Sequence, residues 1–121
     1  MAVVDVTTDA WPTEVLAAQI LTLVDVWAPW CVPCKRVEPM LIDLDERFGG
    51  TVRCVRLNAD DAPELVAHYE VLTLPTLLLI SGGSEVGRVV GVPKRDTLTA
   101  LIQSHLSERC VGHLFQHRHL P

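Results

Sequence analysis

The sequence has no run of about 20 apolar residues, which is the length that a membrane-spanning helix needs. Its two most apolar stretches, residues 20–28 and 71–80, are interrupted by Asp25 and by Pro75. The first residues also lack the basic start and the apolar stretch of an export signal. We therefore expect a soluble, cytoplasmic protein that has no membrane partner.

Basic residues are few as well: 10 Lys and Arg stand against 15 Asp and Glu, which gives a net charge of -5 over 121 residues. They form no cluster, and because nucleic-acid binding depends on many basic contacts to phosphates, we expect no nucleic-acid partner. Gly and Pro, at 7 and 8 residues, are about as frequent as in ordinary globular proteins. With 49% hydrophobic residues, a chain of this length can bury one full core, so we expect one globular domain. Among the partners we expect no second copy of the chain, that is, we expect a monomer.

Strand and helix patterns alternate along the chain and end in a hairpin. The expected strands are residues 3–6, 21–27, 52–57, 76–80 and 86–90, and the expected helices are residues 13–19, 34–48, 62–69 and 98–106. Pro39 should kink the second helix, because its ring removes one backbone hydrogen bond. Residues 81–84 (Ser-Gly-Gly-Ser) predict a hairpin and hence an antiparallel last strand. The expected fold class is α/β, with a central mixed (parallel and antiparallel) five-stranded sheet flanked by helices on both faces.

Two cysteines, Cys31 and Cys34, are separated by two residues where the second expected strand meets the long helix. In that setting a C-x-x-C pair is typical of a redox site. The unpaired N–H groups and the dipole of the helix N-terminus would stabilise a thiolate at Cys31, and the short spacer keeps Cys34 within disulfide reach. We therefore expect Cys31 to attack and Cys34 to resolve.

The alternatives for this pair are half of a zinc site and a purely structural disulfide. Cys54 and Cys110 stand alone and no second C-x-x-C exists, so a zinc site would lack two ligands. Cytosolic thiols are kept reduced, which disfavours a structural disulfide.

Three segments around the pair resemble the thioredoxin family. Residues 24–35 (VDVWAPWCVPCK) are similar to the family's active-site segment, with Val32 in place of the usual Gly. Residues 74–77 resemble its cis-proline loop, and residues 90–91 resemble its docking glycine. Three motifs at family-like intervals are far more specific than one C-x-x-C.

The resemblance extends over residues 3–109 and implies the thioredoxin fold. It places a thioredoxin domain at residues 1–110. A C-terminal tail at residues 111–121 lies outside the resemblance, and we expect it to be flexible.

The same resemblance implies a docking surface for client proteins around the cysteines. Pro75 should follow a cis peptide bond and pack beside Cys31, and the bend should leave backbone groups of Thr73 free to pair with an extended client segment. The alternative is that Pro75 follows a trans bond and merely begins a strand. The expected surface consists of Trp30, Val32, Pro33, Thr73, Leu74, Pro75, Val90, Gly91 and Val92.

Asp25 lies in a strand that should be buried, six residues before Cys31. Burial raises the pKa of a carboxyl group, and a raised pKa suits a proton acceptor. The matching aspartate of the family takes the proton from the resolving thiol, so the resemblance assigns Asp25 as the general base for Cys34. The alternative is a solvent-exposed aspartate at the end of a strand.

Arg56 stands where the family usually has Lys, close to the buried aspartate. Arg keeps its proton even when it is buried, so an Arg56 that points at Asp25 would favour the carboxylate and oppose the upward shift of its pKa. The alternative is a surface ion pair of Arg56 with Asp60 or Asp61, which would have little energetic value.

Three more side chains flank the cysteines. Trp27 and Trp30 are expected as an aromatic pair beside the disulfide, in which Trp27 fixes the loop. An equally good interpretation of Trp27 is that it is simply a core residue. Lys35 is expected to add positive charge near the thiolates. The alternative is a solvated lysine with no role in the site.

The other two cysteines and the tail have simpler expectations. Cys54 alternates with apolar residues in a buried strand and should be inert, whereas Cys110 should be exposed and able to link two molecules. His113, His117 and His119 give the tail an affinity for metals, but they have no fixed geometry, and we expect no native metal site.

The resemblance implies a general protein-disulfide reductase that works by thiol–disulfide exchange through Cys31 and Cys34. It implies disulfide-containing proteins as clients, an NADPH-dependent thioredoxin reductase as the recycling partner, and no cofactor beyond the cysteines. One alternative is a disulfide oxidase or isomerase, since the spacer sets the redox potential and Val32 makes this spacer unusual. The other is a non-catalytic, thioredoxin-like binding or chaperone subunit, which the intact cysteine pair disfavours.

Overall fold

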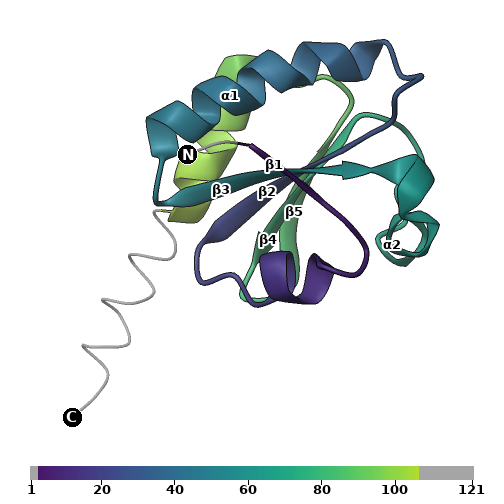
Figure 1. Cartoon of the computed structure of the whole chain (residues 1–121). Coiled ribbons are helices and arrows are strands. Elements are labelled where there is room, and N and C mark those ends of the chain that lie inside the picture. Colours follow the sequence, from purple (N-terminus) through teal and green to yellow (C-terminus); the bar gives the residue numbers. More distant parts are fainter. Residues whose placement is uncertain (1–2, 107–121) are drawn as a thin grey trace.

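Five strands form one mixed sheet in the computed structural model of the chain, which describes residues 3–106 (Figure 1). In their order across the sheet they are β1 (Val4–Val6), β3 (Val52–Asn58), β2 (Leu21–Trp27), β4 (Thr76–Ser81) and β5 (Ser84–Val90). β1 and β2 run parallel to β3, whereas β4 is antiparallel to β2 and to β5. The predicted mixed sheet is confirmed.

Helices cover both faces of this sheet (Figure 1). On one face lie α1 (Val37–Phe48) and a helix over residues 95–106. On the other face lie α2 (Pro63–His68) and the short helical segment η1 (Pro12–Leu16). In the part of the chain that the structure describes, no helix combines the length and the apolarity needed to cross a membrane.

Strand β2 is buried on both faces because it pairs with β3 and β4 and its side chains alternate between two apolar clusters. Leu21 and Leu23 belong to the cluster under α1, whereas Val24 and Val26 belong to the cluster on the α2 side. Because successive side chains of a strand point to opposite faces, Asp25 falls on the α1 face. A carboxyl group therefore lies in the interior of the sheet's central strand.

The helix that follows the cysteines begins later than predicted. The chain first forms a 3₁₀ segment, η2 (Pro33–Arg36), and the α-helix α1 begins only at Val37. Pro39 thus lies in the first turn of α1. At that position a backbone N–H has no partner within the helix, so the missing N–H of proline costs little.

Two other local features follow from their residues. η1 is shorter than the predicted helix, and the Ala17 N–H donates to the Pro12 carbonyl at 2.9 Å in a wide last turn. Gly82 and Gly83 form the predicted hairpin turn between β4 and β5, with φ values of 59° and 83° that only glycine adopts readily.

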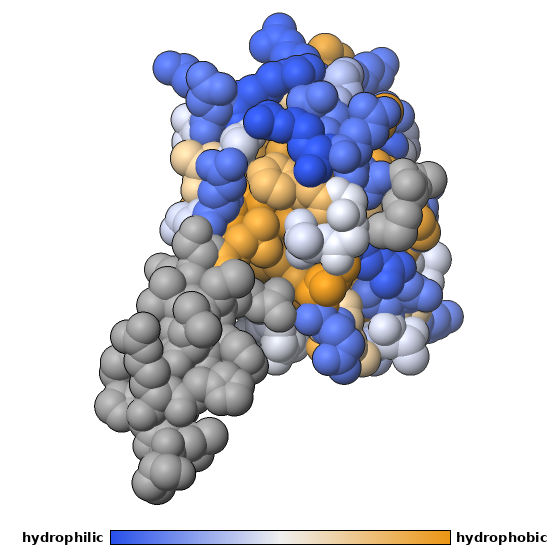
Figure 2. Space-filling view, turned by 90° about the vertical axis from the view of Figure 1, so that its left-hand side faces the viewer, coloured by the Kyte–Doolittle hydropathy of each residue, from blue (hydrophilic) through white to orange (hydrophobic). Residues whose placement is uncertain are grey.

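The end of the molecule away from the cysteines also carries apolar surface, flanked by polar side chains (Figure 2). The end of α1 and the helix over residues 95–106 lie on this side in Figure 1. Phe48, Leu101 and Leu106 are partly buried there and extend the cluster under α1 toward the surface. Apolar surface is therefore not restricted to the cysteine end.

The predictions about Cys110, His113, His117, His119 and the tail at residues 111–121 lie outside the described residues.

Candidate functional site

A disulfide joins Cys31 and Cys34 just beyond the end of β2, and their Cα atoms are 5.4 Å apart. β2 ends at Trp27, and the chain turns before η2 leads directly into α1. In this turn the Cys31 N–H donates to the Ala28 carbonyl at 3.1 Å. The predicted strand-to-helix position of the pair is confirmed.

Both cysteines are largely buried: Cys31 is 4% exposed and Cys34 is 2% exposed. They form a small cluster with Ala28, against which Trp27 and Leu74 pack. Cys31 lies two residues before the helical run begins at Pro33, and the unpaired N–H groups and positive dipole end of that run favour a thiolate at Cys31. A client must therefore reach the sulfur of Cys31 over the exposed residues around it.

Asp25 is completely buried in β2, and burial raises the pKa of its carboxyl group to about 6. The Arg56 guanidinium opposes this rise by its charge and its hydrogen bond, whereas the nearby Glu38 carboxylate adds to it. Among the described residues, no group donates a hydrogen bond to Asp25 Oδ1. Desolvation therefore outweighs the one cation beside this carboxyl group.

Arg56 contacts three side chains at once. Its Nε lies 3.5 Å from Asp25 Oδ2, and one terminal nitrogen lies 3.9 Å from a Glu38 carboxylate oxygen. The centre of its guanidinium group lies 4.1 Å from the centre of the Trp27 ring, which is a cation–π distance. The pairing of Arg56 with Asp25 follows from the sheet, because these two residues are direct partners in the β2–β3 register. The alternative pairing of Arg56 with Asp60 or Asp61 is wrong.

The raised pKa of Asp25 has a consequence for stability. The folded pKa of about 6 lies above the unfolded value of 3.8, so ionising the carboxyl group disfavours the folded state. This cost is absent below about pH 4, grows between about pH 4 and pH 6, and is constant above that range. A shift of this size corresponds to about 3 kcal/mol at neutral pH.

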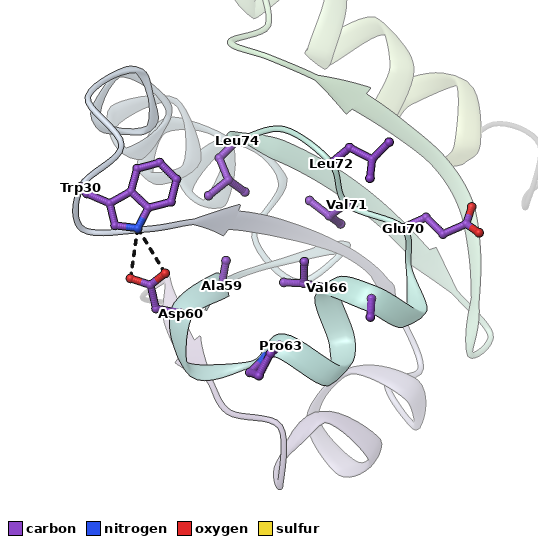
Figure 3. A pocket seen from close by; sticks show the side chains of 10 residues that line it. Trp30, Ala59, Asp60, Pro63, Val66, Glu70, Val71, Leu72 and Leu74 are labelled. Atoms are coloured by element: carbon purple, nitrogen blue, oxygen red, sulfur yellow. Dashed lines mark hydrogen bonds between the residues drawn. The ribbon is translucent and has the colours of Figure 1, made fainter.

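Trp27 and Trp30 do not stack on each other. Trp27 packs against the cysteine cluster and carries the Arg56 guanidinium on its ring. Trp30 is 67% exposed, and its Nε1–H donates to both carboxylate oxygens of Asp60 at 3.2 Å (Figure 3). The two rings therefore have different surroundings: Trp27 lies against the cysteine cluster, and Trp30 lies at the surface. Lys35 is exposed at the start of the helical run.

The loop before β4 has the predicted form. The Leu74–Pro75 peptide bond is cis, Pro75 is buried, and its carbonyl accepts a hydrogen bond from the Gly91 N–H at 2.8 Å. This bond joins the loop to the end of β5, where Val90 is exposed. Two segments that are distant in sequence thus meet beside the cysteines.

One detail of this loop differs from the prediction. The Thr73 carbonyl is not free, because the Thr76 hydroxyl donates to it at 2.6 Å. Within residues 3–106 the Thr73 N–H has no hydrogen bond, so it is the available backbone group. The side chain of Thr73 is exposed, as are those of Val32 and Pro33.

Two contributors to the site were missed in the sequence. Glu38 follows Cys34 by one helical turn, and that spacing was the available signal for a carboxylate on the cysteine side of the helix. Asp60, which holds Trp30, had no such signal, because the two residues are 30 positions apart.

Cys54 takes no part in the site. It is buried under α1, and burial raises the pKa of its thiol to about 12, which keeps it protonated and unreactive. Within residues 3–106, no three or more His, Cys, Asp or Glu side chains are grouped so that they could hold a metal ion.

A C-x-x-C disulfide at the end of a central strand, with a buried carboxyl group behind it, defines a dithiol–disulfide oxidoreductase. A family model described as thioredoxin matches residues 2–104. Thioredoxin 1 of Nostoc sp. is 35% identical over 105 residues, which are 87% of this chain and 98% of the relative. Thioredoxin of Synechocystis sp. is 37% identical over 93 residues, which are 77% of this chain and 87% of the relative. The M-type chloroplastic thioredoxin of Spinacia oleracea is 34% identical over 103 residues, which are 85% of this chain and 57% of that protein.

The chain therefore belongs to the thioredoxin family and has its fold. It is a protein-disulfide oxidoreductase that acts as a thiol–disulfide reductase, with disulfide-containing proteins as its clients.

The three-way contact of Arg56 predicts opposite changes in the pKa of Asp25 for two substitutions. Arg56→Met removes the cation and should raise this pKa above about 6, whereas Glu38→Gln removes a negative charge and should lower it. The pKa is measured by carbon NMR of the Asp25 carboxyl group in the oxidised protein. Arg53→Met, the same change on the same strand at a residue that pairs with Glu14, is the control and should leave it unchanged.

A pKa of Asp25 that does not rise in Arg56→Met would show that Arg56 is not its partner. A pKa of Asp25 that does not fall in Glu38→Gln would show that the charge of Glu38 does not act on Asp25.

Proposed function

We propose that Cys31 is the attacking thiol, Cys34 the resolving thiol, and Asp25 the base that accepts the proton of Cys34. The observation that supports this assignment best is the buried Asp25 carboxyl group with a pKa of about 6. A carboxylate with that pKa accepts a proton near neutral pH far better than an exposed aspartate does, because a general base works best when its pKa is near the operating pH.

The reaction has two exchange steps. The Cys31 thiolate attacks one sulfur of the client disulfide, forms a mixed disulfide with it, and releases the other sulfur as a thiolate. The Cys34 thiol then gives its proton to Asp25 and attacks the sulfur of Cys31, which releases the second client thiolate. Two electrons pass to the client, the released thiolates take up protons, and the protein is left with the Cys31–Cys34 disulfide.

The docking surface that we propose surrounds the disulfide. An extended client segment lies against the exposed side chains and pairs with the Thr73 N–H, in the manner of an added strand. Occupation of the Thr73 carbonyl by Thr76 makes the N–H the main hydrogen-bonding group of that residue. The surface comprises Trp30, Val32, Pro33, Thr73, Leu74, Pro75, Val90, Gly91 and Val92.

Three residues tune the redox chemistry in this proposal. Arg56 limits the rise in the pKa of Asp25, and Trp27 holds Arg56 in place through the ring contact. Lys35 adds positive charge near the start of the helical run, where it favours a thiolate.

The remaining proposals concern the setting of the reaction. A thioredoxin reductase that draws electrons from NADPH recycles the dithiol, and the protein needs no cofactor or metal of its own. The protein works as a monomer, with no nucleic-acid or membrane partner, in the cytoplasm, where thiols are kept reduced. The catalytic domain covers residues 1–110.

The division of roles predicts different outcomes for the two cysteine variants. Cys34→Ser should still attack a client disulfide but accumulate as a mixed disulfide, because no thiol is left to release the client. Cys31→Ser should neither turn over nor trap the client. Non-reducing electrophoresis of each variant with a disulfide-containing protein measures this difference, and trapping by Cys31→Ser instead would reverse the two roles.

The recycling proposal predicts that NADPH is consumed when the protein, a thioredoxin reductase and insulin are combined. Omission of the protein, or its replacement by Cys31→Ser, should stop this consumption, whereas Cys54→Ser should leave it unchanged because Cys54 is buried and protonated. Insulin reduction that proceeds with dithiothreitol but not with NADPH and the reductase would contradict the proposed partner.

A further inference from the structure

A groove of about 760 Å³ begins at Trp30 and extends away from the cysteines along α2 (Figure 3). Its apolar lining comes from the segment around Ala59, from α2 and from the loop that leads to Pro75. The larger apolar side chains that the groove presents include Trp30, Val66, Val71, Leu72 and Leu74, and Ala59 lies among them. None of these belongs to the proposed docking surface except Trp30 and Leu74, so the groove continues that surface in one direction.

The groove connects directly to the reacting sulfurs. Leu74, in its lining, packs against the cluster that contains Cys31 and Cys34. Trp30 forms one wall, and its ring is held in place by the two hydrogen bonds from its Nε1–H to Asp60. A client segment whose cysteine sits on Cys31 can therefore continue into the groove without a break.

Leu72 is the most exposed large apolar side chain in the described part of the chain, with 91% of its surface accessible. An isolated exposed leucine needs no explanation, but this one stands on the rim of an apolar groove next to a reactive site. Covering Leu72 and the groove together would remove a continuous apolar surface from water, which favours binding of an apolar side chain.

The charged residues of the groove are both acidic. Asp60 lies at the end beside Trp30, and Glu70 lies at the opposite end, where its carboxylate is directed outward from the other lining residues (Figure 3). Arg88 is the cation whose charge interacts with Glu70, but its hydrogen bonds go to Glu85 at 2.6 and 2.7 Å and to the Tyr69 carbonyl at 2.7 Å. The carboxylate of Glu70 is thus left without a hydrogen-bonded cation within the described residues.

The backbone of Glu70 adds a second observation. Its φ is 52°, in the left-handed region that side chains other than Asn and Asp rarely adopt. A glycine would relieve this conformation at no steric cost. This position follows the end of α2, where the Val71 N–H donates to the Val66 carbonyl at 2.9 Å, so Glu70 occupies the left-handed position after a helix that glycine usually fills.

We propose that this groove binds the segment of a client protein next to its reactive cysteine, and that it selects segments with an apolar residue for the groove floor and a lysine or arginine for Glu70. The inference rests on the proposed reductase function and names the class of client on which that function acts. Asp60 contributes negative charge at the near end but remains occupied by Trp30.

The test uses peptides whose single cysteine is in a mixed disulfide with thionitrobenzoate, so that attack releases a coloured product. Lysine is placed in turn at each position on either side of the cysteine, next to a fixed leucine, and compared with glutamine and glutamate. Wild-type protein should react with the best lysine peptide about two- to five-fold faster in kcat/KM than with its glutamate counterpart, the range for an exposed charge pair. The preference should fall as salt is added.

Variants of the groove separate the contribution of the Glu70 charge from that of the apolar Leu72 side chain. Glu70→Gln should remove the preference for lysine and Glu70→Lys should reverse it, whereas Glu46→Gln, an exposed carboxylate on α1, should leave it intact. Leu72→Ser should lower kcat/KM about ten-fold for the leucine peptides and have no effect on peptides with serine in place of leucine. Val86→Ser, an exposed apolar residue on β5, is the control for this change.

Hydroxyethyl disulfide, which has no peptide next to its disulfide, distinguishes failure of the reductase function from failure of the groove assignment. If neither this compound nor any peptide is reduced, the proposed reductase function itself is wrong. If the compound is reduced normally by all variants but the lysine preference is absent or survives Glu70→Lys, the assignment of the groove is overturned. Concentration-dependent dimerisation that Leu72→Ser abolishes would also overturn it, because the groove would then bind a second copy of this chain.

Discussion

The carboxyl group of Asp25 is buried in the middle of β2, and its charge has to be balanced from within the fold. β3 and β4 pair with β2 on both sides, so no edge of the strand is open to water beside this residue. Arg56 is the direct register partner of Asp25 on β3, yet it stands 3.5 Å away and also faces Glu38 and Trp27. One cation shared in this way lowers the pKa of Asp25 without restoring its ordinary value.

The rest of the site follows from where β2 ends. The cysteine pair lies just beyond the last residue of the strand, where a helical run begins. A proton acceptor inside the sheet and a thiolate site at its edge therefore belong to the same segment. The cis-proline loop and the end of β5 close around the disulfide through the Gly91–Pro75 hydrogen bond. Proton transfer thus depends on the interior of the sheet, and client binding depends on the loops at its edge.

Much of this arrangement could be predicted from the sequence. The β2 segment is apolar on both faces, which indicated a central strand and made Asp25 conspicuous in it. The positions of the C-x-x-C pair and of Pro75 could be predicted because the motifs that mark them are local in the chain. The start of α1 was missed because a 3₁₀ turn and an α-helix have similar sequence patterns over one turn. Two hydrogen bonds could not be predicted from periodicity. The bond from Trp30 to Asp60 joins segments that are distant in the chain, and the bond from the Thr76 hydroxyl to the Thr73 carbonyl depends on a tight turn.

The most direct test of the account is the pH dependence of the resolving step, measured as release of client from a preformed mixed disulfide with Cys31. In the wild-type protein the rate should rise as Asp25 ionises near its pKa of about 6 and then level off. In Asp25→Asn the rate at pH 7 should be about 100-fold lower and should rise only at higher pH, as the Cys34 thiol ionises without a base. Identical pH profiles for the two proteins would contradict the central role of Asp25.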